Sequence, residues 1–381
     1  MFLRLFAFIF FLIFNLTIYA QDTKDSHIEF GGALRYNIFA KSWVADQTQP
    51  EFTWDTWRLN IDGAVKGVDL SFEYRFYPSS NAHFLHHGYF GYDISKYLYV
   101  KLGVSQVPFG IASFASNNYF FQGQYYFGLE DDYDMGINFS YTGIKNLALD
   151  LAYFREAEPA GSGGINSRYS YDVVAGNGYS GNNKELATIK ELNQANLRAV
   201  YNIIPEIKLG ISGQVGGIYN QVLDKSTWST ALAAHLHGTF KHGWDIKASY
   251  INHHYNAVSD LNNKLDIVPM GAYGATYGVA AKANTYSAGL SKTFKVNCGF
   301  IEAIEAHVDY AYIDKTDASF FDTQQLVPGI VLSGGPFYIY MDYAMGKNHP
   351  WLTPSFGDGL DQGEATANWE KRFNINLGYY F

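Results

Sequence analysis

Hydrophobic and polar residues alternate along most of this chain, and the last ten residues show the pattern most clearly. Between 372 and 381, polar or small residues other than Tyr380 are interleaved with Phe373, Ile375, Leu377, Tyr379 and Phe381. A period of two is typical of a β-strand with one apolar and one polar face. About ten such residues, tilted by about 45°, cross a bilayer. Since a spanning strand cannot leave its edges unpaired in hydrocarbon, the pattern predicts a closed barrel with many similar strands upstream.

The same period predicts sixteen strands in total. They are expected at 27–39, 51–64, 67–78, 84–94, 97–107, 134–142, 146–155, 193–203, 206–220, 227–240, 243–255, 282–294, 302–314, 324–334, 337–346 and 371–381. The predicted fold class is therefore all-β, a transmembrane antiparallel β-barrel with an even number of strands. The last strand is expected to pair with 27–40 and close the sheet. Long and short gaps alternate, which predicts short periplasmic turns on one rim and long extracellular loops on the other.

Two of the long gaps have features of their own. The gap at 108–133 is more apolar and aromatic than a surface loop needs to be. We expect it to fold into the lumen as a constriction loop, with a lid over the mouth as the alternative. In the longest gap, 155–191, Asn183 is a candidate cap for a short surface helix that carries Leu186, Ile189 and Leu192.

The N-terminus predicts a secretory signal peptide at 1–20, because Arg4 precedes a short apolar run that is broken at Asn15. Cleavage is expected between Ala20 and Gln21, which leaves 21–381 as one barrel domain. Export of a barrel points to the outer membrane of a Gram-negative bacterium, with membrane lipid as a partner. The terminal Phe381 resembles the signal by which the barrel assembly machinery recognises outer-membrane barrels.

Composition narrows the function classes. The formal net charge is −9 at pH 7, which argues against nucleic-acid binding. Hydrophobic residues make up 48% of the chain, although no apolar run of the mature part is long enough for a membrane-spanning helix. The single cysteine, Cys298, excludes an intramolecular disulfide.

Sequence matches to catalytic, cofactor-binding or metal-binding motifs are each better explained as ordinary loop or lumen residues. The GxGxxG match at 176–181 lacks a preceding strand and is interpreted as a flexible surface loop. Two other groups are interpreted as polar lumen residues and as a solvated acidic loop rather than as metal sites: His86, His87, His235 and His237, and Asp358, Asp361 and Glu364. No nucleophile elbow is present, so we expect no enzyme activity, no cofactor and no metal.

Three motifs in the first part of the chain carry a family resemblance. The stretch 101–110, KLGVSQVPFG, resembles the strand-to-loop signature of the phosphate-selective porin O/P family of bacterial outer-membrane porins. Arg58-Leu59 with Gly63 resembles the second strand of that family, and Asp134-Met-Gly136 resembles the opening of its sixth strand. The resemblance implies a channel of sixteen strands that assembles as a homotrimer.

Charged residues on the expected polar strand faces and in the stretch 108–133 are candidates for lining a pore. They are Arg35, Arg58, Arg75, Lys101, Glu73, Glu130, Asp131, Asp132 and Asp134. Arginine is sparse in the second strand, and the stretch 108–133 contains acidic residues but no Lys or Arg. Because a phosphate pore needs closely placed cations, these departures argue against anion selectivity.

The expected function is therefore passive diffusion of small hydrophilic solutes or ions. One alternative is a sugar-type channel, because a run of aromatic residues could stack on pyranose rings: Tyr119, Phe120, Phe121, Tyr125, Tyr126 and Phe127. A second alternative is a non-conducting surface adhesin or structural barrel whose long loops bind partners.

Overall fold

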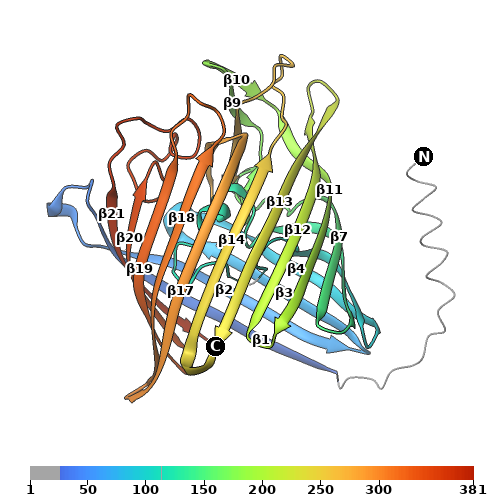
Figure 1. Ribbon diagram of the computed structural model, residues 1–381, viewed down its shortest axis with the longest axis vertical. Helices are drawn as coiled ribbons and strands as arrows, with labels where there is room; N and C mark the ends of the chain where they lie inside the picture. Colours follow the sequence, from blue (N-terminus) through green and yellow to red (C-terminus); the bar gives the residue numbers. More distant parts are fainter. Residues whose placement is uncertain (1–25, 113) are drawn as a thin grey trace.

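The computed structural model describes residues 26–381 apart from 113, and the predicted signal peptide at 1–20, with Ala20 and Gln21, lies outside them. Sixteen antiparallel strands form a closed barrel (Figure 1). They are β1 (His27–Lys41), β2 (Glu51–Val65), β3 (Val68–Tyr77), β4 (Ala82–Ser95), β5 (Leu98–Gln106), β6 (Tyr133–Ile144), β7 (Leu147–Ala157), β11 (Ile189–Ile204), β12 (Ile207–Asn220), β13 (Lys225–Phe240), β14 (Trp244–His254), β17 (Lys282–Cys298), β18 (Ile301–Lys315), β19 (Thr323–Gly334), β20 (Phe337–Lys347) and β21 (Glu370–Tyr380). The predicted barrel and its strand count are confirmed.

The barrel closes between its first and last strands. β21 pairs with β1 from Tyr380 opposite Ala33 to Arg372 opposite Lys41. The terminal Phe381 continues this pairing, because its backbone exchanges hydrogen bonds of 2.8 and 3.0 Å with Gly32. The pairing begins later along β1 than the predicted 27–40, since the first residues of β1 pair with β2 alone in the described sheet.

The two faces of the wall have opposite chemistry, as β13 illustrates. Leu232 is 61% exposed and Trp228 is 59% exposed on the outer face. Ala231, Ala233 and His235 alternate with them and are buried on the inner face. A soluble barrel would cover its large apolar side chains, whereas this one presents them outward as a lipid-facing surface. The closed, apolar-faced barrel agrees with the predicted outer-membrane location.

The turns at one rim are short and the loops at the other are long (Figure 1). Lys66 and Gly67 connect β2 to β3 with φ values of 52° and 80°. Positive φ at both central residues is typical of a two-residue hairpin turn whose twist matches the flanking strands. The chain ends at the rim of the short turns (Figure 1).

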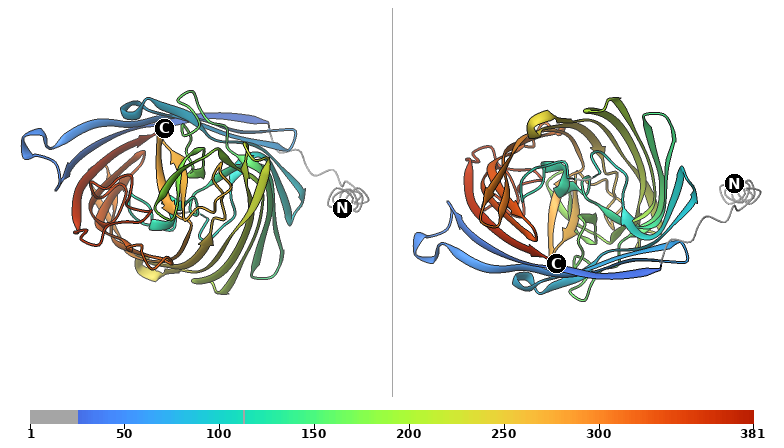
Figure 2. Two further views of the ribbon diagram at one scale, coloured as in Figure 1. Left: turned by 90° about the horizontal axis from the view of Figure 1, so that it is seen from above. Right: turned by 90° about the horizontal axis from the view of Figure 1, so that it is seen from below.

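Five further strands form a second sheet that lies across the barrel opening in both end views (Figure 2). They are β8 (Asp172–Val173), β9 (Gly176–Ser180), β10 (Asn183–Ala187), β15 (Ile267–Ala272) and β16 (Ala275–Ala280). Both gaps that contain these strands were predicted to be loops, so the second sheet was not predicted from the sequence. The stretch 176–181 was likewise predicted to be a flexible surface loop, whereas most of it is β9.

The prediction of a short helix capped by Asn183 is wrong. Asn183 pairs with Ser180 across the β9–β10 hairpin, where Gly181 has a φ of 55°. Leu186 is 59% exposed whereas Ile189, which begins β11, is 1% exposed. Their spacing of three residues imitates a helical stripe, but the two side chains lie in different environments on different strands.

Helical structure in the described chain is limited to four 3₁₀ turns. They are η1 (Asp46–Thr48), η2 (Pro78–Ser80), η3 (Gly123–Phe127) and η4 (Lys241–Gly243). None of the helices described here is long and apolar enough to cross a membrane. Cys298 is exposed and unpaired at the end of β17.

Candidate functional site in the barrel lumen

Residues 107–132, here called the inward segment, leave the wall after β5 and run inside the barrel before β6 (Figure 2). Its first anchors are on the far wall. The Gly110 N–H donates to Ser212 Oγ of β12 over 3.1 Å, and Arg198 Nε of β11 donates to the Gly110 carbonyl over 2.8 Å. These bonds replace the water that an unattached loop backbone would need.

A second anchor is the carboxylate of Asp309 on β18. It accepts hydrogen bonds from the Asn117 N–H over 2.8 Å, from Asn117 Nδ2 over 3.0 Å and from Asn118 Nδ2 over 2.8 Å. Lys247 of β14 donates to the Ser116 carbonyl over 3.0 Å. Hydrogen bonds to charged groups are stronger than neutral ones, so these contacts fix the middle of the segment.

Tyr119 carries the segment to the first two strands. Its N–H donates to Asp342 Oδ2 of β20 over 2.9 Å, and its hydroxyl donates to Asp55 Oδ1 of β2 over 2.8 Å. Asn37 of β1 donates to the same hydroxyl over 3.2 Å. Since β1 and β12 are eight strands apart in a ring of sixteen, the inward segment is attached to opposite walls of the barrel.

The second half of the inward segment is an aromatic core. Tyr125, Tyr126 and Phe127 of η3 are 3%, 4% and 0% exposed, and they belong to one apolar cluster with Met270 and Tyr277 of the second sheet. The Tyr277 hydroxyl donates to the Tyr126 carbonyl over 2.7 Å. These rings therefore serve as packing between the segment and the second sheet.

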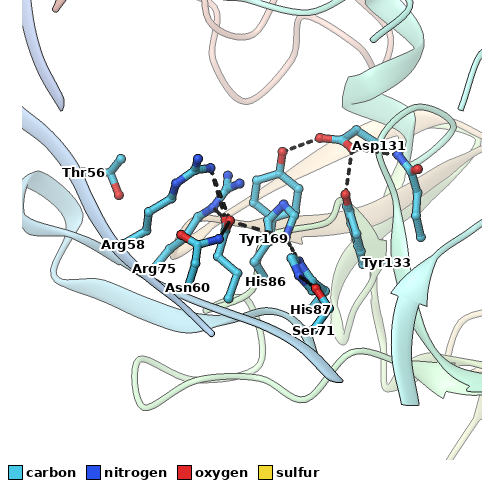
Figure 3. A network of polar contacts seen from close by, with 12 residues as sticks. Thr56, Arg58, Asn60, Ser71, Arg75, His86, His87, Asp131, Tyr133 and Tyr169 are labelled. Carbon is cyan, nitrogen blue, oxygen red and sulfur yellow. Dashed lines mark hydrogen bonds and ion pairs between the residues drawn. The ribbon is translucent and has the colours of Figure 1, made fainter. Parts of the chain in front are cut away.

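A basic network lies on the inner face of β2 and β3 (Figure 3). The Glu73 carboxylate lies between two guanidinium groups, with Arg58 at 3.3 Å and Arg75 in direct contact. Asn60 Nδ2 also donates to Glu73 over 2.7 Å. Nearby, Arg35 pairs with Asp55 at 2.9 Å. Each of the two carboxylates thus has a cationic partner on the wall.

The same network continues to the inward segment through an aromatic ring. The Arg75 guanidinium lies 4.5 Å from the ring centroid of Tyr169, and the Tyr169 hydroxyl donates to Asp131 over 2.6 Å (Figure 3). Gln106 and Tyr133 donate to the other oxygen of Asp131 over 2.9 and 3.2 Å. Burial raises the pKa of Asp131, while these hydrogen bonds and Arg75 oppose that shift.

Glu130 has a structural position rather than an open one. It is 4% exposed and accepts hydrogen bonds from the Ala115 N–H over 3.0 Å and the Gln122 N–H over 3.3 Å. Burial and the charge of Asp131 raise its pKa to about 8, although the two backbone donors favour the carboxylate. Glu130 thus bridges two turns of the inward segment.

The structure brings some of the predicted pore residues together and separates others. Arg58, Glu73 and Arg75 form the basic network, and Asp131 joins it through Tyr169. Lys101 instead lies 4.7 Å from the ring centroid of Tyr89 on the wall. Asp132 and Asp134 lie within a second, acidic group near Asp172.

Several polar residues that hold the inward segment were not singled out from the sequence. They are Asp309, Asp342, Arg198, Lys247 and Asn37. In the sequence, these residues are distinguished only by their position on the polar face of a strand, and many other residues share such a position. Their partners on the segment lie far away in the chain, so no local spacing pointed to them.

The histidine candidates differ in their partners. His86 and His87 contact each other through Nδ1 atoms 2.8 Å apart, and Glu73 lies 3.8 Å from His86. The sequence did not indicate this third group, but both oxygens of the Glu73 carboxylate already have donors, Oε1 in Arg75 and Oε2 in Asn60. His237 pairs with Asp245 at 2.8 Å, and His235 is buried on the inner wall.

The prediction that Asp358, Asp361 and Glu364 form a solvated acidic loop is confirmed only in part. Glu364 is exposed, whereas Asp361 is 5% exposed against the rest of the loop. Burial, with the charge of Asp358, raises the pKa of Asp361 to about 6.

Two glycines of the motifs that carried the family resemblance have a packing role. Gly103 has a φ of 131°, and a Cβ atom there would lie 2.4 Å from the Gly88 carbonyl oxygen on β4. A Cβ atom at Gly136 would lie 2.1 Å from the Tyr153 carbonyl oxygen on β7. Neighbouring strands thus require glycine at both positions, whatever passes through the lumen.

Comparison with known proteins identifies the fold. No protein-family model matches the chain, and no curated protein sequence matches it. Among solved structures, it is similar to the outer membrane channel DcaP of Acinetobacter baumannii, with a TM-score of 0.57, 12% identity and coverage of 95% of this chain and 100% of that one. It is also similar to OmpT lacking loop L8, from Vibrio cholerae, with a TM-score of 0.56, 13% identity and coverage of 94% and 100%.

A third similar structure is OprB of Pseudomonas putida, with a TM-score of 0.56, 9% identity and coverage of 93% of this chain and 94% of that one. At these identities the likeness establishes a shared outer-membrane barrel fold.

Proposed function

We propose that this protein is an outer-membrane porin, a passive diffusion channel for small hydrophilic solutes or ions. The observation that carries the proposal is a closed barrel with an apolar outer face and a polar inner wall, crossed by an inward segment that is anchored on opposite sides. The segment then sets the width of the passage. DcaP, which has a similar fold, is described as a channel.

Size exclusion is the first property to test. Liposome swelling would be compared for a series of neutral oligosaccharides and for charged solutes of equal size. The proposal expects rates that fall with solute size and do not saturate. Saturable flux of sugars would favour the sugar-type channel, which the burial of Tyr125, Tyr126 and Phe127 does not support.

Ion selectivity is a finer part of the proposal. The resemblance to phosphate-selective porins suggests anion transport, and Arg35, Arg58 and Arg75 are gathered on one wall. However, Asp55 and Glu73 are bonded to these arginines and neutralise much of their charge. We therefore propose a weakly selective pore rather than a phosphate channel.

The reversal potential in a salt gradient tests this selectivity. A weakly selective pore gives a small reversal potential, and Arg58→Ala and Lys101→Ala change it only slightly. A strong anion preference that collapses in these two variants would instead support the phosphate channel. A strong cation preference would exclude it.

Assembly is the last part of the proposal. A homotrimer follows from the family resemblance, and recognition by the barrel assembly machinery follows from Phe381, which ends the closing strand. Cross-linking in native membranes would test the trimer. If purified, folded protein shows no single-channel conductance, the surface adhesin becomes the better explanation.

A further inference from the structure

A group of buried carboxylates lies where the inward segment, the second sheet and the wall meet. Asp132 of the segment, Asp134 of β6 and Asp172 of β8 each offer an oxygen, and these atoms all lie within 4.8 Å of one another. The three residues are 7%, 2% and 1% exposed. Like charges at this separation repel strongly in a buried site unless a cation or shared protons compensate them.

A fourth carboxylate, outside this trio, points to a missing cation. Glu158 is 1% exposed, and its Oε1 accepts hydrogen bonds from the N–H groups of Tyr169 and Ser170 over 3.1 and 2.8 Å. Its Oε2 has no hydrogen-bond partner, and the guanidinium of Arg168 lies 4.0 Å from it. Burial, and then the charge of Asp172, raises the pKa of Glu158. A buried carboxylate oxygen left without a donor is costly.

The protein's own donors occupy only part of this acidic group. Gln194 donates to Asp134 Oδ2 over 2.9 Å, and Arg168 donates to Asp172 Oδ2 over 2.8 Å. Asp132 Oδ1 and Asp134 Oδ1 have no partner. Donors therefore fix one oxygen of Asp134 and one of Asp172, whereas Asp132 Oδ1 and Asp134 Oδ1 remain without a hydrogen bond. Among the described contacts, Arg168 is the one cation that reaches this group.

We infer that Asp132, Asp134, Asp172 and Glu158 form a Ca²⁺ site that ties the inward segment to the wall and the second sheet. Ca²⁺ takes six to eight oxygen ligands at about 2.3–2.6 Å in irregular geometry, and carboxylates are its usual protein ligands. Mg²⁺ demands a near-octahedral set and gives up water reluctantly, so it fits this arrangement less well.

The site has a structural consequence because its ligands come from separate parts of the chain. Asp172 belongs to β8, which pairs with β15 of the second sheet, while Asp134 lies in the wall and Asp132 ends the inward segment. An ion held by all three would stabilise their arrangement relative to one another. The inference concerns binding and stability, so it stands apart from the proposed channel function.

The test uses the whole protein, folded in detergent and freed of divalent ions with EDTA. Calcium chloride is titrated by calorimetry, and the melting temperature is measured with Ca²⁺, with Mg²⁺ and with EDTA. We expect saturable binding of one Ca²⁺ per chain and a higher melting temperature in Ca²⁺ than in Mg²⁺. Asp172→Asn should weaken Ca²⁺ binding by at least about tenfold, whereas Glu364→Gln, in the exposed acidic loop, should bind as the parent does.

Asp134→Asn provides a second variant if Asp172→Asn fails to fold, with the same expected loss. The inference is overturned if Ca²⁺ neither binds nor raises the melting temperature of the parent protein. It is also overturned if Asp172→Asn or Asp134→Asn binds Ca²⁺ as tightly as the parent. A rise in the melting temperature of Asp172→Asn in EDTA, with no response of the parent to Ca²⁺, would show that shared protons compensate the charges instead.

Discussion

Strand β13 and the inward segment show two ways in which this chain is held in place. β13 pairs with β12 in unbroken register from Lys225 to Gly238, so backbone hydrogen bonds fix it whatever its side chains are. The inward segment has few such bonds to the wall and depends on particular side chains such as Asp309, Asp342 and Arg198. The wall therefore tolerates substitutions that keep its outer face apolar, whereas the segment is sensitive to single polar changes.

The largest effect is expected from a charge on the outer face of the wall. Leu232 lies in the middle of β13 and is 61% exposed. Leu232→Arg should lower the stability of the barrel in lipid by about 2–4 kcal/mol, because the charge would lie near the bilayer midplane. Folding into lipid vesicles as a function of urea concentration measures this loss.

Ser226→Arg is the matched control on the same face of β13, close to the loop end of the strand. Its cost should be about 0–1 kcal/mol, as for a charge near the interface. Equal losses for the two variants would contradict the assignment of this face to lipid.

A smaller and more local effect is expected when an anchor of the inward segment is removed. Asp309→Ala leaves the part-buried Asn117 N–H and the buried Asn118 Nδ2 without their acceptor, which costs about 1–3 kcal/mol in the docked state. Amide hydrogen exchange should rise in the peptides that cover 107–132, while the strands of the wall keep their protection.

Asp314→Ala is the control, because Asp314 lies on the same strand, half-exposed, and alternates with the buried residues of the inner face. It should leave exchange in the inward segment unchanged. If both variants raise exchange equally, the segment is not held by Asp309.

The smallest effect is a dependence on pH. The pKa of Glu130 is raised from 4.5 to about 8, so the folded state binds its proton more tightly than the unfolded state does. The stabilisation from this proton is fully present below pH 4.5 and is lost as the pH rises through about 8. Glu130→Gln should flatten the pH dependence of hydrogen exchange in the inward segment over this range, and an unchanged profile would contradict the shift.

The wall could be predicted from the sequence because the pattern that determines it, the alternation of apolar and polar residues along each strand, is local. In β3, the consecutive residues Phe72 and Glu73 face lipid and lumen respectively, and β13 shows the same alternation. Hydrophobic periodicity alone thus located sixteen strands, and the alternation of gap lengths placed the short turns and the long loops on opposite rims.

The interior could not be predicted in the same way because it depends on contacts between residues that are far apart in the chain. Asn117 and Asp309 are separated by 192 positions, and no spacing pattern links them. Asp172 was read as part of a loop, since a strand of two residues has no detectable period. The charges of Arg58, Glu73 and Arg75 were seen in the sequence, but which carboxylate neutralises which arginine depended on the register of β2 and β3.

Single-channel conductance in planar bilayers tests the central claim most directly. The parent protein is compared with a variant in which residues 111–128 are replaced by a short glycine and serine linker, after both are shown to fold as barrels. We expect discrete openings of low conductance for the parent and a conductance several times larger for the variant, because the obstruction is removed from the lumen. Equal conductance in the two, or none in either, would contradict a water-filled barrel narrowed by the inward segment.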